Sequence, residues 1–362
     1  MTLQARPGIM DVQPYRPGAP APEGAVKLSS NENALGCSPK ASQAFVNAMN
    51  KLHIYPDGGA TQLRQAIANS EHIDFRQIVC GAGSDEILQL IGRAFLSEGD
   101  KVVQSQYGFL VYRLVAMQSG AYVAFAPEKN FTTNIDALIE TAGDDTKIVF
   151  LANPNNPTGT VVPLRDIKRL REKLPKKTLL VLDGAYDEFV DMQDYKGALD
   201  LVDNHDNMVV TRTFSKIHGL AAVRLGWMYA PEYIADIIQR VRGPFNVNLP
   251  AIEAGIAAIE DKEFLEKSKN FNKHELRFLL QSLRGFGYEV SPSVCNFVMI
   301  HFPSQPGQTA RDANKFLTSK GLIVRDLRAY GLPDALRISI GSKDANRQVV
   351  DALETFKKQS TH

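Results

Sequence analysis

Between residues 77 and 211, short apolar runs alternate with longer amphipathic segments. Strands are expected at 78–80, 101–104, 122–125, 148–151, 179–182 and 208–211, and helices at 86–95, 111–118 and 164–173. Nearly continuous apolar strands that alternate with helices are typical of a parallel sheet covered on both faces. The pattern therefore predicts an α/β domain around a mostly parallel sheet. Because ligands in such folds bind at the carboxyl ends of the strands, the residues that follow each strand are candidate site residues.

The segments on either side of this alternation differ from it. The first forty residues are rich in Pro and Gly, which predicts an extended arm that lies on another part of the chain or on a partner subunit. After Pro250, helices are expected at 252–259, 262–283, 310–319 and 345–356, and strands at 297–300, 322–324 and 336–340. We predict an arm and small-domain segment at 1–40, a large domain at 41–255 and a smaller α+β domain at 256–362.

The overall composition argues against several classes of protein. The 362 residues include 41 basic and 40 acidic side chains, a net charge of +1, with no basic stripe that would indicate nucleic-acid binding. The three cysteines lack CxxC spacing and the seven histidines form no HExxH pair, so neither a disulfide framework nor a metal site is expected. No run reaches about 18 apolar residues, and no signal peptide is expected at the N-terminus. We expect a cytoplasmic enzyme that does not bind membranes.

Small and polar residues follow the first strand, in the run Gly81-Ala82-Gly83-Ser84-Asp85. Glycines allow a backbone to approach an anion closely, and the N-terminus of the following helix offers free N–H groups. The turn therefore predicts a phosphate site, although a tight connection without a ligand has the same composition. A dinucleotide site would need glycine at the position of Glu86, so a nicotinamide dehydrogenase is not favoured.

Two later strands also end in polar groups. The run 153–159, Asn-Pro-Asn-Asn-Pro-Thr-Gly, follows the strand at 148–151. Its rigid residue types hold a polar side chain in a fixed place, as a plain surface turn also does. Asp183 closes the strand at 179–182, with Tyr186 shortly after it. A carboxylate there needs a cation or hydrogen-bond donors, which a ligand, a helix cap or a structural ion pair would each explain.

Lys216 follows the strand at 208–211, near Thr213, Ser215 and Arg224. Most lysines are solvated surface charges, but a lysine in a pocket has a lowered pKa and attacks carbonyl groups. Thr213, Ser215 and Arg224 together suit a phosphate. Pyridoxal 5'-phosphate needs a Lys Schiff base, a carboxylate on its pyridinium nitrogen and phosphate-binding groups, so these signals together indicate that cofactor. The charge of Asp183 would favour the protonated ring.

These motifs resemble those of the fold-type I pyridoxal-phosphate aminotransferases, and the resemblance extends over nearly the whole chain. Within that group the chain is most similar to the histidinol-phosphate aminotransferases. The resemblance is carried by residues 28–33 (Leu-Ser-Ser-Asn-Glu-Asn), 55–58, 81–86, 153–159, Asp183 with Tyr186, 212–216 (Arg-Thr-Phe-Ser-Lys), 219–226, 244–248 and 336–341. The blocks at 153–159 and 212–216 are specific in combination.

The resemblance implies a fold and a set of cofactor contacts. The fold would be a large domain with a mostly parallel seven-stranded sheet flanked by helices, plus a smaller α+β domain. Lys216 would form the Schiff base and then move the proton, with Asp183 on the pyridine nitrogen. Asn156 and Tyr186 would bind the phenolic oxygen, and Tyr107 would stack on the ring. The phosphate would be bound by Ala82, Gly83, Ser84, Asp85, Thr213, Ser215 and Arg224, and by Tyr55 from the neighbouring subunit of a homodimer.

The resemblance also implies the substrate contacts. Arg337 would bind the substrate carboxylate in bidentate geometry, beside Asn156. Arg325 and Tyr15 would bind the distal phosphate or the side-chain carboxylate. No metal is implied.

The chain departs from the family pattern at three places. Ala34 stands where Pro is frequent, and Gly184 stands where Glu is frequent. The frequent Pro before the stacking aromatic is absent ahead of Tyr107, which leaves Tyr112 as the alternative for that role. None of these positions carries a group that the chemistry requires.

The activity that the resemblance implies is a ping-pong transamination, in two covalent half-reactions through Lys216. Glutamate would give up its amino group and leave as 2-oxoglutarate. Imidazole acetol phosphate would take the amino group and leave as L-histidinol phosphate, a step of histidine biosynthesis. The alternatives are an aromatic amino acid aminotransferase on the same scaffold, a decarboxylase of a phosphorylated amino acid and, least favoured, a cofactor-binding regulatory protein. The shape of the pocket decides between the first of these and the favoured activity.

Overall fold

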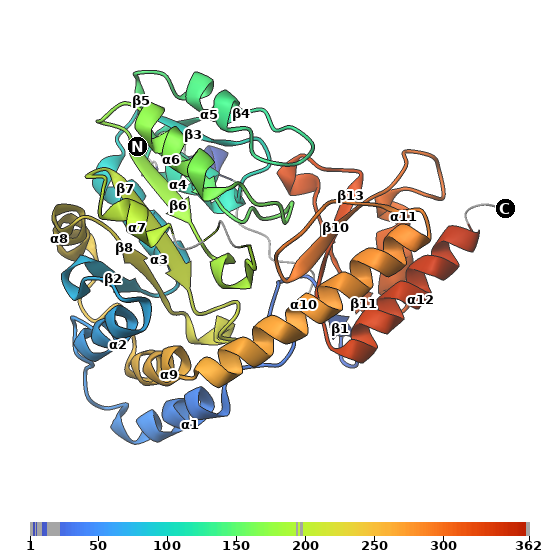
Figure 1. The fold of residues 1–362 in the computed structure, drawn as a ribbon, viewed down its shortest axis with the longest axis horizontal. Coiled ribbons are helices and arrows are strands. Elements are labelled where there is room, and N and C mark those ends of the chain that lie inside the picture. The colour runs from blue at the N-terminus through green and yellow to red at the C-terminus, as the bar shows by residue number, and fades with distance from the viewer. Residues whose placement is uncertain are drawn as a thin grey trace.

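The computed structural model describes residues 3, 5, 9–12, 22–192, 195 and 198–359 of the chain. Figure 1 shows two bodies side by side, a larger one around a wide sheet and a smaller one that includes the C-terminal helices. The long helix α10 (Lys262–Gly285) runs from the larger body along the smaller one. It therefore connects the two bodies.

The large body is built on a seven-stranded sheet with the order β2-β8-β7-β6-β5-β3-β4. Its strands are β2 (Ile78–Gly81), β3 (Lys101–Ser105), β4 (Tyr122–Ala126), β5 (Thr146–Ala152), β6 (Leu179–Asp183), β7 (Met208–Thr213) and β8 (Gly226–Tyr229). Strand β8 is antiparallel to both of its neighbours, and the remaining pairs are parallel. The expected mostly parallel seven-stranded sheet is therefore confirmed.

The strands are buried on both faces, which explains their nearly continuous apolar sequences. Along β5, Val149 and Leu151 face one core while Ile148 and Phe150 face the other, as the two-residue period of a strand requires. The first core includes residues of α1 (Pro39–Ala48), α2 (Thr61–Glu71), α5 (Ile135–Ala142), α6 (Leu164–Lys173), α7 (Leu199–Val202) and α9 (Leu249–Glu260). The second includes residues of α3 (Ser84–Phe95), α4 (Leu110–Gln118) and α8 (Glu232–Val241).

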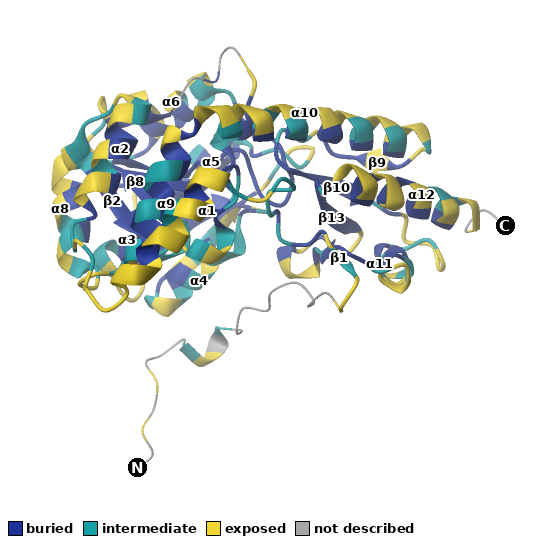
Figure 2. Cartoon of the chain, turned by 90° about the horizontal axis from the view of Figure 1, so that it is seen from below, coloured by how far each residue is buried: buried dark blue, intermediate teal, exposed yellow. Residues whose placement is uncertain are grey.

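The smaller body has its own sheet and its own core. Its antiparallel sheet has the order β12-β13-β10-β9, with β9 (Glu289–Val290), β10 (Phe297–His301), β12 (Arg325–Asp326) and β13 (Ala335–Ser339). Helices α10, α11 (Ala310–Ser319) and α12 (Lys343–Gln359) pack around this core, and Figure 2 shows α10 exposed along one side and buried along the other.

The N-terminal segment is attached to the smaller body. Strand β1 (Val26–Lys27) pairs in parallel with β11 (Leu322–Ile323), and Leu28 is buried in the same core. The remaining elements are short 3-10 turns: η1 (Ile9–Asp11), η2 (Met49–Lys51), η3 (Phe75–Gln77), η4 (Asp187–Phe189), η5 (Ala221–Val223) and η6 (Arg328–Tyr330). Residues 26–28 of the arm thus lie on the small body of the same chain.

The structure differs from the sequence expectations at some elements. The strand expected at 322–324 corresponds to β11 at Leu322 and Ile323, which pair with the N-terminal segment, and a separate strand that was not expected begins at Arg325, which pairs with β13. The sequence pattern does not indicate β8, which is a short run that starts at a glycine, although its Trp227 is buried in the core. It also does not indicate α1, α2, α5 and α8, whose stability comes from packing on other elements of the large body.

The expected domain boundary at residue 255 falls inside α9. Ala258 and Ile259 of that helix are buried in the core of the large body. Leu265, at the start of α10, packs in a separate cluster with Tyr186 and Phe297. Side chains on both sides of residue 255 therefore share one core, and the division of the chain at 255 stays a prediction.

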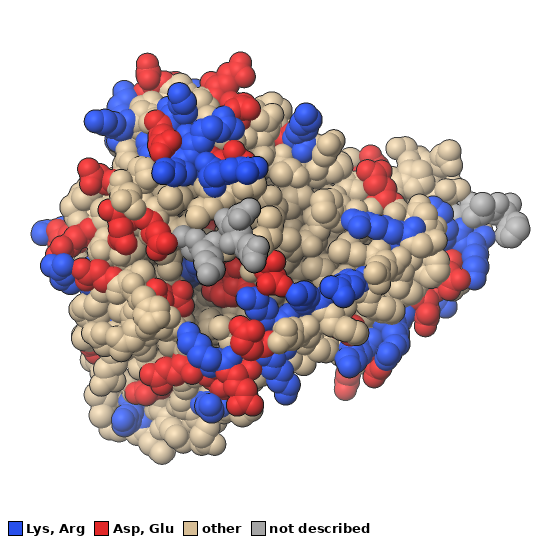
Figure 3. Space-filling view, in the orientation of Figure 1, with Lys and Arg blue, Asp and Glu red and all other residues tan. Residues whose placement is uncertain are grey.

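The surface carries charges of both signs. On the face that Figure 3 shows, lysine and arginine side chains are interspersed with aspartate and glutamate. Across residues 22–192 and 198–359, none of the helices combines the length and the apolar composition that crossing a membrane requires. Within the part of the chain that the structure describes, no three His, Cys, Asp or Glu side chains gather in a way that could hold a metal ion.

Candidate active site

The carboxyl ends of the large sheet meet the N-terminal segment and the smaller body around one pocket. Many of the predicted site residues line it: Ser84, Asp85, Asn156, Asp183, Tyr186, Thr213, Ser215, Lys216, Arg224, Arg325 and Arg337. They come from the ends of β5, β6 and β7, the start of α3 and the sheet of the smaller body. The fold thus brings together residues that are far apart in the sequence, at the edge where parallel sheets bind ligands.

One end of the pocket is formed by the start of α3. Gly83 precedes this helix and provides no side-chain cap, so the N–H groups of its first turn, at Ser84 and Asp85, face the pocket without a capping side chain. Gly83 has a φ of +85°, and a Cβ there would lie 2.5 Å from Nη2 of Arg224, so glycine is required. Arg224 crosses this turn, with its Nη2 3.4 Å from the Asp85 carboxylate. A helix start beside a guanidinium is a suitable site for a phosphate.

The end of β7 lies against the same helix start. Thr213 pairs with Gly226 on β8, and a Cβ at Gly226 would lie 2.4 Å from the backbone nitrogen of Ser84. The Ser215 N–H donates to Oγ1 of Thr213 at 3.1 Å, which folds the chain after the strand toward the pocket. The end of β7 and the start of α3 therefore form one polar side of the pocket.

Asp183 ends β6 and is buried at the edge of the sheet. Tyr112 donates to its Oδ2 at 2.7 Å, and Thr211 Oγ1 and the Ala185 N–H each donate to its Oδ1 at 3.2 Å. Burial raises the pKa of Asp183 above its ordinary value, and the hydrogen bond from Tyr112 acts in the opposite direction. A buried carboxylate in this setting suits a cationic group, whose charge would favour the ionised form.

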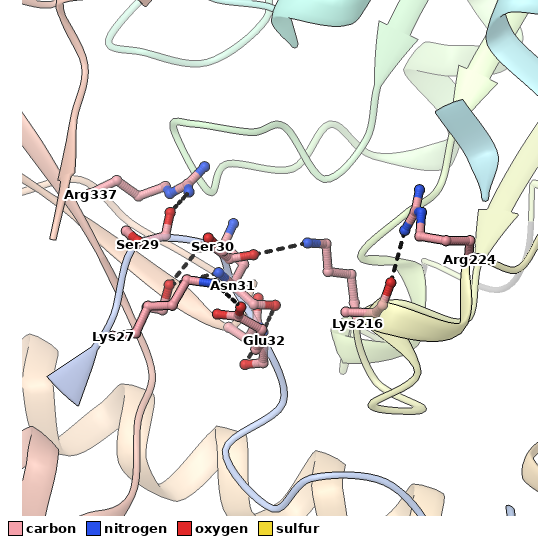
Figure 4. A network of polar contacts seen from close by, with 11 residues as sticks. Lys27, Ser29, Ser30, Asn31, Glu32, Lys216, Arg224 and Arg337 are labelled. Carbon is pink, nitrogen blue, oxygen red and sulfur yellow. Dashed lines mark hydrogen bonds and ion pairs between the residues drawn. The ribbon is translucent and has the colours of Figure 1, made fainter. Parts of the chain in front are cut away.

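Lys216 follows β7, and its Nζ donates to the carbonyl oxygen of Ser30 at 3.2 Å (Figure 4). Burial, together with the positive charge of Arg337, lowers the pKa of Lys216 from 10.5 to about 8. Near that pH a large share of the side chain is neutral. A neutral amine in a pocket is the form that attacks a carbonyl carbon.

Tyr186 and Asn156 each accept a hydrogen bond on their side-chain oxygen. Asn31 Nδ2 donates to Tyr186 Oη at 2.9 Å, and Arg337 Nη1 donates to Asn156 Oδ1 at 2.5 Å. Burial raises the pKa of Tyr186, so its hydroxyl keeps its proton. Among the described residues, neither the Tyr186 proton nor the Asn156 amide N–H groups meet an acceptor. Both side chains are therefore donors available to a ligand.

Arg325 on β12 lies directly opposite Arg337 on β13, and both line the pocket. Like charges at opposed positions disfavour a sheet, so the pair indicates an anion site rather than a stabilising feature. Arg337 donates to Asn156 and to the Ser29 carbonyl, while its buried Nε meets no partner in the described part of the chain. Because a guanidinium has five N–H donors, Arg337 keeps donors for a carboxylate or a phosphate.

This set of residues fits pyridoxal 5'-phosphate. The start of α3 with Thr213, Ser215 and Arg224 suits the phosphate. Asp183 suits the ring nitrogen and Lys216 suits the aldehyde. The individual roles stay predictions.

The structure places aromatic side chains other than Tyr107 along the pocket. Tyr107 does not line the pocket, whereas Phe109 and Tyr112 do. The Tyr107 N–H donates to Glu128, and its ring lies 5.9 Å from the ring of Phe131, centroid to centroid. The Tyr112 hydroxyl donates to Asp183, which leaves the Phe109 ring as a further candidate for stacking, and the stacking role of Tyr107 stays a prediction.

Four other predicted residues lie outside the pocket or outside the described residues. The Ala82 N–H donates to Oε2 of Glu86 at 2.6 Å, so Ala82 and Gly83 shape the turn rather than line the pocket. Tyr55 is 79 % exposed and stacks on Phe245 with a centroid distance of 4.7 Å, away from the pocket of its own chain. Tyr15 lies outside the described residues.

Sequence reasoning assigned no role to Ser29, Ser30, Asn31 and Tyr330, which also line the pocket. The first three belong to the block at 28–33 that resembles the aminotransferases, and that block was the available signal. No local pattern marks Tyr330, which lies on the short turn η6 between two strands of the smaller body.

Known proteins are similar to this chain in sequence and in fold. The family Aminotransferase class I and II matches residues 23–353. The chain is 60 % identical over 361 residues to the histidinol-phosphate aminotransferase of Maricaulis maris, with 99 % of this chain and 100 % of that protein covered. The chain belongs to the histidinol-phosphate aminotransferase family.

Two other members of the histidinol-phosphate aminotransferase family extend the comparison. The protein of Paramagnetospirillum magneticum is 50 % identical over 360 residues, with 98 % of this chain and 99 % of that protein covered. The crystal structure of the Sinorhizobium meliloti protein, in complex with pyridoxal 5'-phosphate, superposes with a TM-score of 0.91 at 25 % identity and covers 99 % of both chains. The family membership and the fold that the sequence implied are therefore confirmed.

Proposed function

We propose that this protein is a pyridoxal-phosphate-dependent transaminase. It interconverts L-histidinol phosphate and 2-oxoglutarate with imidazole acetol phosphate and L-glutamate. Family membership supports the transamination. The observation that carries the choice of substrates is the opposed pair Arg325 and Arg337, in the same pocket as Lys216 and Asp183.

The two substrates place different anions near the reacting carbon. Glutamate carries a carboxylate there, and histidinol phosphate carries a phosphate ester on the next carbon. Two adjacent guanidinium groups can bind either anion, because each offers paired N–H donors to carboxylate or phosphate oxygens. The second guanidinium of Arg325 adds the charge that a dianionic phosphate needs. The pair therefore supports one site that accepts both substrates in turn.

Other residues of the chain would move the proton and hold the cofactor. When bound, the cofactor supplies an electron sink for the negative charge that develops at the amino-bearing carbon. Lys216 would take and return the proton at that carbon, because its buried amine is neutral in a large share of molecules near pH 8. Asp183 would keep the ring nitrogen protonated. Tyr186 and Asn156 would donate hydrogen bonds to the phenolic oxygen, from the donors that face the pocket.

The proposal includes a homodimer in which Tyr55 of one subunit reaches the phosphate of the other. Its support is an exposed apolar segment, in which Tyr55 stacks on Phe245, and Met49, Leu52 and Ile54 are each more than half exposed. Exposed apolar groups of this extent are typical of interaction surfaces. Light scattering tests the oligomeric state. The cytoplasmic location stays a prediction from the sequence.

An absorbance spectrum of the purified protein tests the proposed reaction. Glutamate should bleach the band of the bound cofactor, and imidazole acetol phosphate should then restore it. These two steps establish both half-reactions and the phosphorylated substrate together. Recovery with an aromatic keto acid alone would replace the substrate assignment with an aromatic amino acid, and no band after addition of pyridoxal 5'-phosphate would refute the proposal.

A further inference from the structure

Asn31 lies on the N-terminal segment that passes between Lys216 and Arg337 (Figure 4). It is 1 % exposed and has a φ of +58°, a conformation that Asn adopts more readily than most residues. Its N–H donates to Ser339 Oγ at 2.8 Å, and its carbonyl accepts from Asn296 Nδ2 at 2.9 Å. Two residues of the smaller body therefore hold both backbone polar groups of Asn31.

Ser339 also sets the orientation of the Asn31 amide. Since Ser339 Oγ accepts the backbone N–H, its own proton is available to Asn31 Oδ1, which lies 2.9 Å away. The amide oxygen is thereby turned toward Ser339, and the Nδ2 group is turned toward Tyr186, to which it donates at 2.9 Å. Asn31 is therefore a donor to Tyr186 and not an acceptor from it.

We propose that Asn31 is a positioning residue that directs the hydroxyl proton of Tyr186 into the pocket. A tyrosine hydroxyl has one proton, and an oxygen that accepts from an amide N–H directs that proton elsewhere. Tyr186 is buried, and among the described residues its hydroxyl bonds to Asn31 alone, so the remaining direction for the proton is the pocket that Tyr186 lines. The smaller body thus determines, through Asn31, how a residue of the large body meets its ligand.

Asn156, the second donor to the pocket, is oriented in a similar way. Asn156 has its oxygen turned toward Arg337, which can only donate, so its amide N–H groups are left for the pocket. Two residues are therefore prepared as donors for one acceptor. The inference rests on the proposed function, in which that acceptor is the phenolic oxygen of the cofactor.

Replacement of Asn31 by Asp tests the direction of the hydrogen bond. Asp has the same shape but no N–H, so the Tyr186 hydroxyl would donate to residue 31 and no longer to the pocket. With Asn31→Asp we expect the dissociation constant for pyridoxal 5'-phosphate, titrated into cofactor-free protein, to rise about tenfold. The pH midpoint of the bound cofactor's absorbance band should rise by about one unit, because a donor to the phenolic oxygen favours its charged form.

Two further variants separate this role from a structural one. Ser339→Ala leaves the amide free to turn and should shift both quantities in the same direction by a smaller factor, about threefold in affinity. Asn272→Asp is the matched control, because it removes a buried amide that donates to the Cys295 carbonyl at 3.1 Å and does not line the pocket. It should lower thermal stability and leave both the affinity and the pH midpoint unchanged.

A double variant shows whether Asn31 acts through Tyr186. In the Tyr186→Phe background, Asn31→Asp should change neither quantity further, because the hydroxyl that it directs is gone. The inference is overturned if Asn31→Asp matches the wild type, or if its full effect persists without the Tyr186 hydroxyl. A wild type that binds no pyridoxal 5'-phosphate overturns the proposed function and this inference with it, whereas a binding wild type with a silent Asn31→Asp overturns the inference alone.

Discussion

The two ends of the pocket are built in different ways. The end that we propose binds the cofactor, the cofactor end, is made by neighbours along the chain, where β2 leads into α3 and β7 leads into Lys216. The end that we propose binds the substrate, the substrate end, is made by strands β12 and β13 of the smaller body and by the N-terminal segment around Ser29. Local turns at strand ends place the first set, and long-range pairing places the second. The comparison suggests that changes at the first end affect chemistry and cofactor binding, while changes at the second affect substrate choice.

The largest effect is expected at Lys216. Replacement by Ala should lower turnover by at least about a thousandfold, because no other group takes over the proton transfer. Steady-state rates with glutamate and the phosphorylated ketone measure this. The exposed Lys262 is the control, and its replacement by Ala should leave turnover within about twofold. Near-normal turnover of Lys216→Ala would remove this lysine from the mechanism.

The substrate end is tested with Arg325→Ala. A charged hydrogen bond contributes about 1.5–3 kcal/mol, so KM for imidazole acetol phosphate should rise about tenfold or more, with kcat at saturation changed far less. Arg328→Ala changes a mostly exposed arginine of the same body and should leave both constants unchanged. If Arg325→Ala lowers kcat as strongly as it raises KM, the division between the two ends fails.

At the cofactor end, Phe109 and Tyr107 are two nearby candidates for stacking on the cofactor ring. Phe109→Leu should raise the dissociation constant for pyridoxal 5'-phosphate about fivefold to tenfold, because an aromatic contact contributes about 0.5–1.5 kcal/mol. Tyr107→Phe keeps the packing against Phe131 and should stay within about twofold of the wild type. Titration of cofactor-free protein measures both values, and the reverse order of effects would return the stacking role to Tyr107.

The last effect concerns stability rather than activity or binding. The pKa of Lys216 is lowered to about 8 in the folded protein, below its value in the unfolded chain. Below pH 8 both states carry the charge and the folded state bears the burial penalty; as pH rises from about 8 to about 10.4 the unfolded state binds more protons and the penalty is relieved. Cofactor-free Lys216→Met should therefore be more stable than the wild type by about 2 kcal/mol near pH 7, with the difference shrinking above pH 8. Urea denaturation at several pH values measures it, and a gap that does not change with pH would contradict this explanation.

Much of the large body and of the cofactor end could be predicted. Asp183, Thr213 and Lys216 each follow an apolar strand, and the rule that ligands bind at strand ends applies to each of them without knowledge of the rest of the fold. Strand β8 and the helices α1, α2, α5 and α8 were not indicated. Their patterns are short or weak by themselves, and packing against other elements of the large body stabilises them.

The substrate end was harder to predict for a different reason. Arg325 and Arg337 were assigned through a resemblance, yet only the pairing of β12 with β13 shows that they stand opposite one another. Strand β12 was not indicated, because Arg325 and Asp326 are charged and only their pairing with β13 makes them a strand. Likewise Tyr107 and Phe109 differ by two positions, and the turn before α4 decides which of them lines the pocket.

The sequence by itself determined the alternation of strands and helices, the polar groups at the strand ends and the lysine that follows one of those strands. These follow from periodicity and from residues adjacent in the chain. The tertiary structure decided which aromatic rings line the pocket, that Arg325 and Arg337 lie opposite one another, and that Asn31 donates to Tyr186. Each of these depends on the register or the hydrogen-bond direction between segments far apart in the chain, and local propensity carries no information about either.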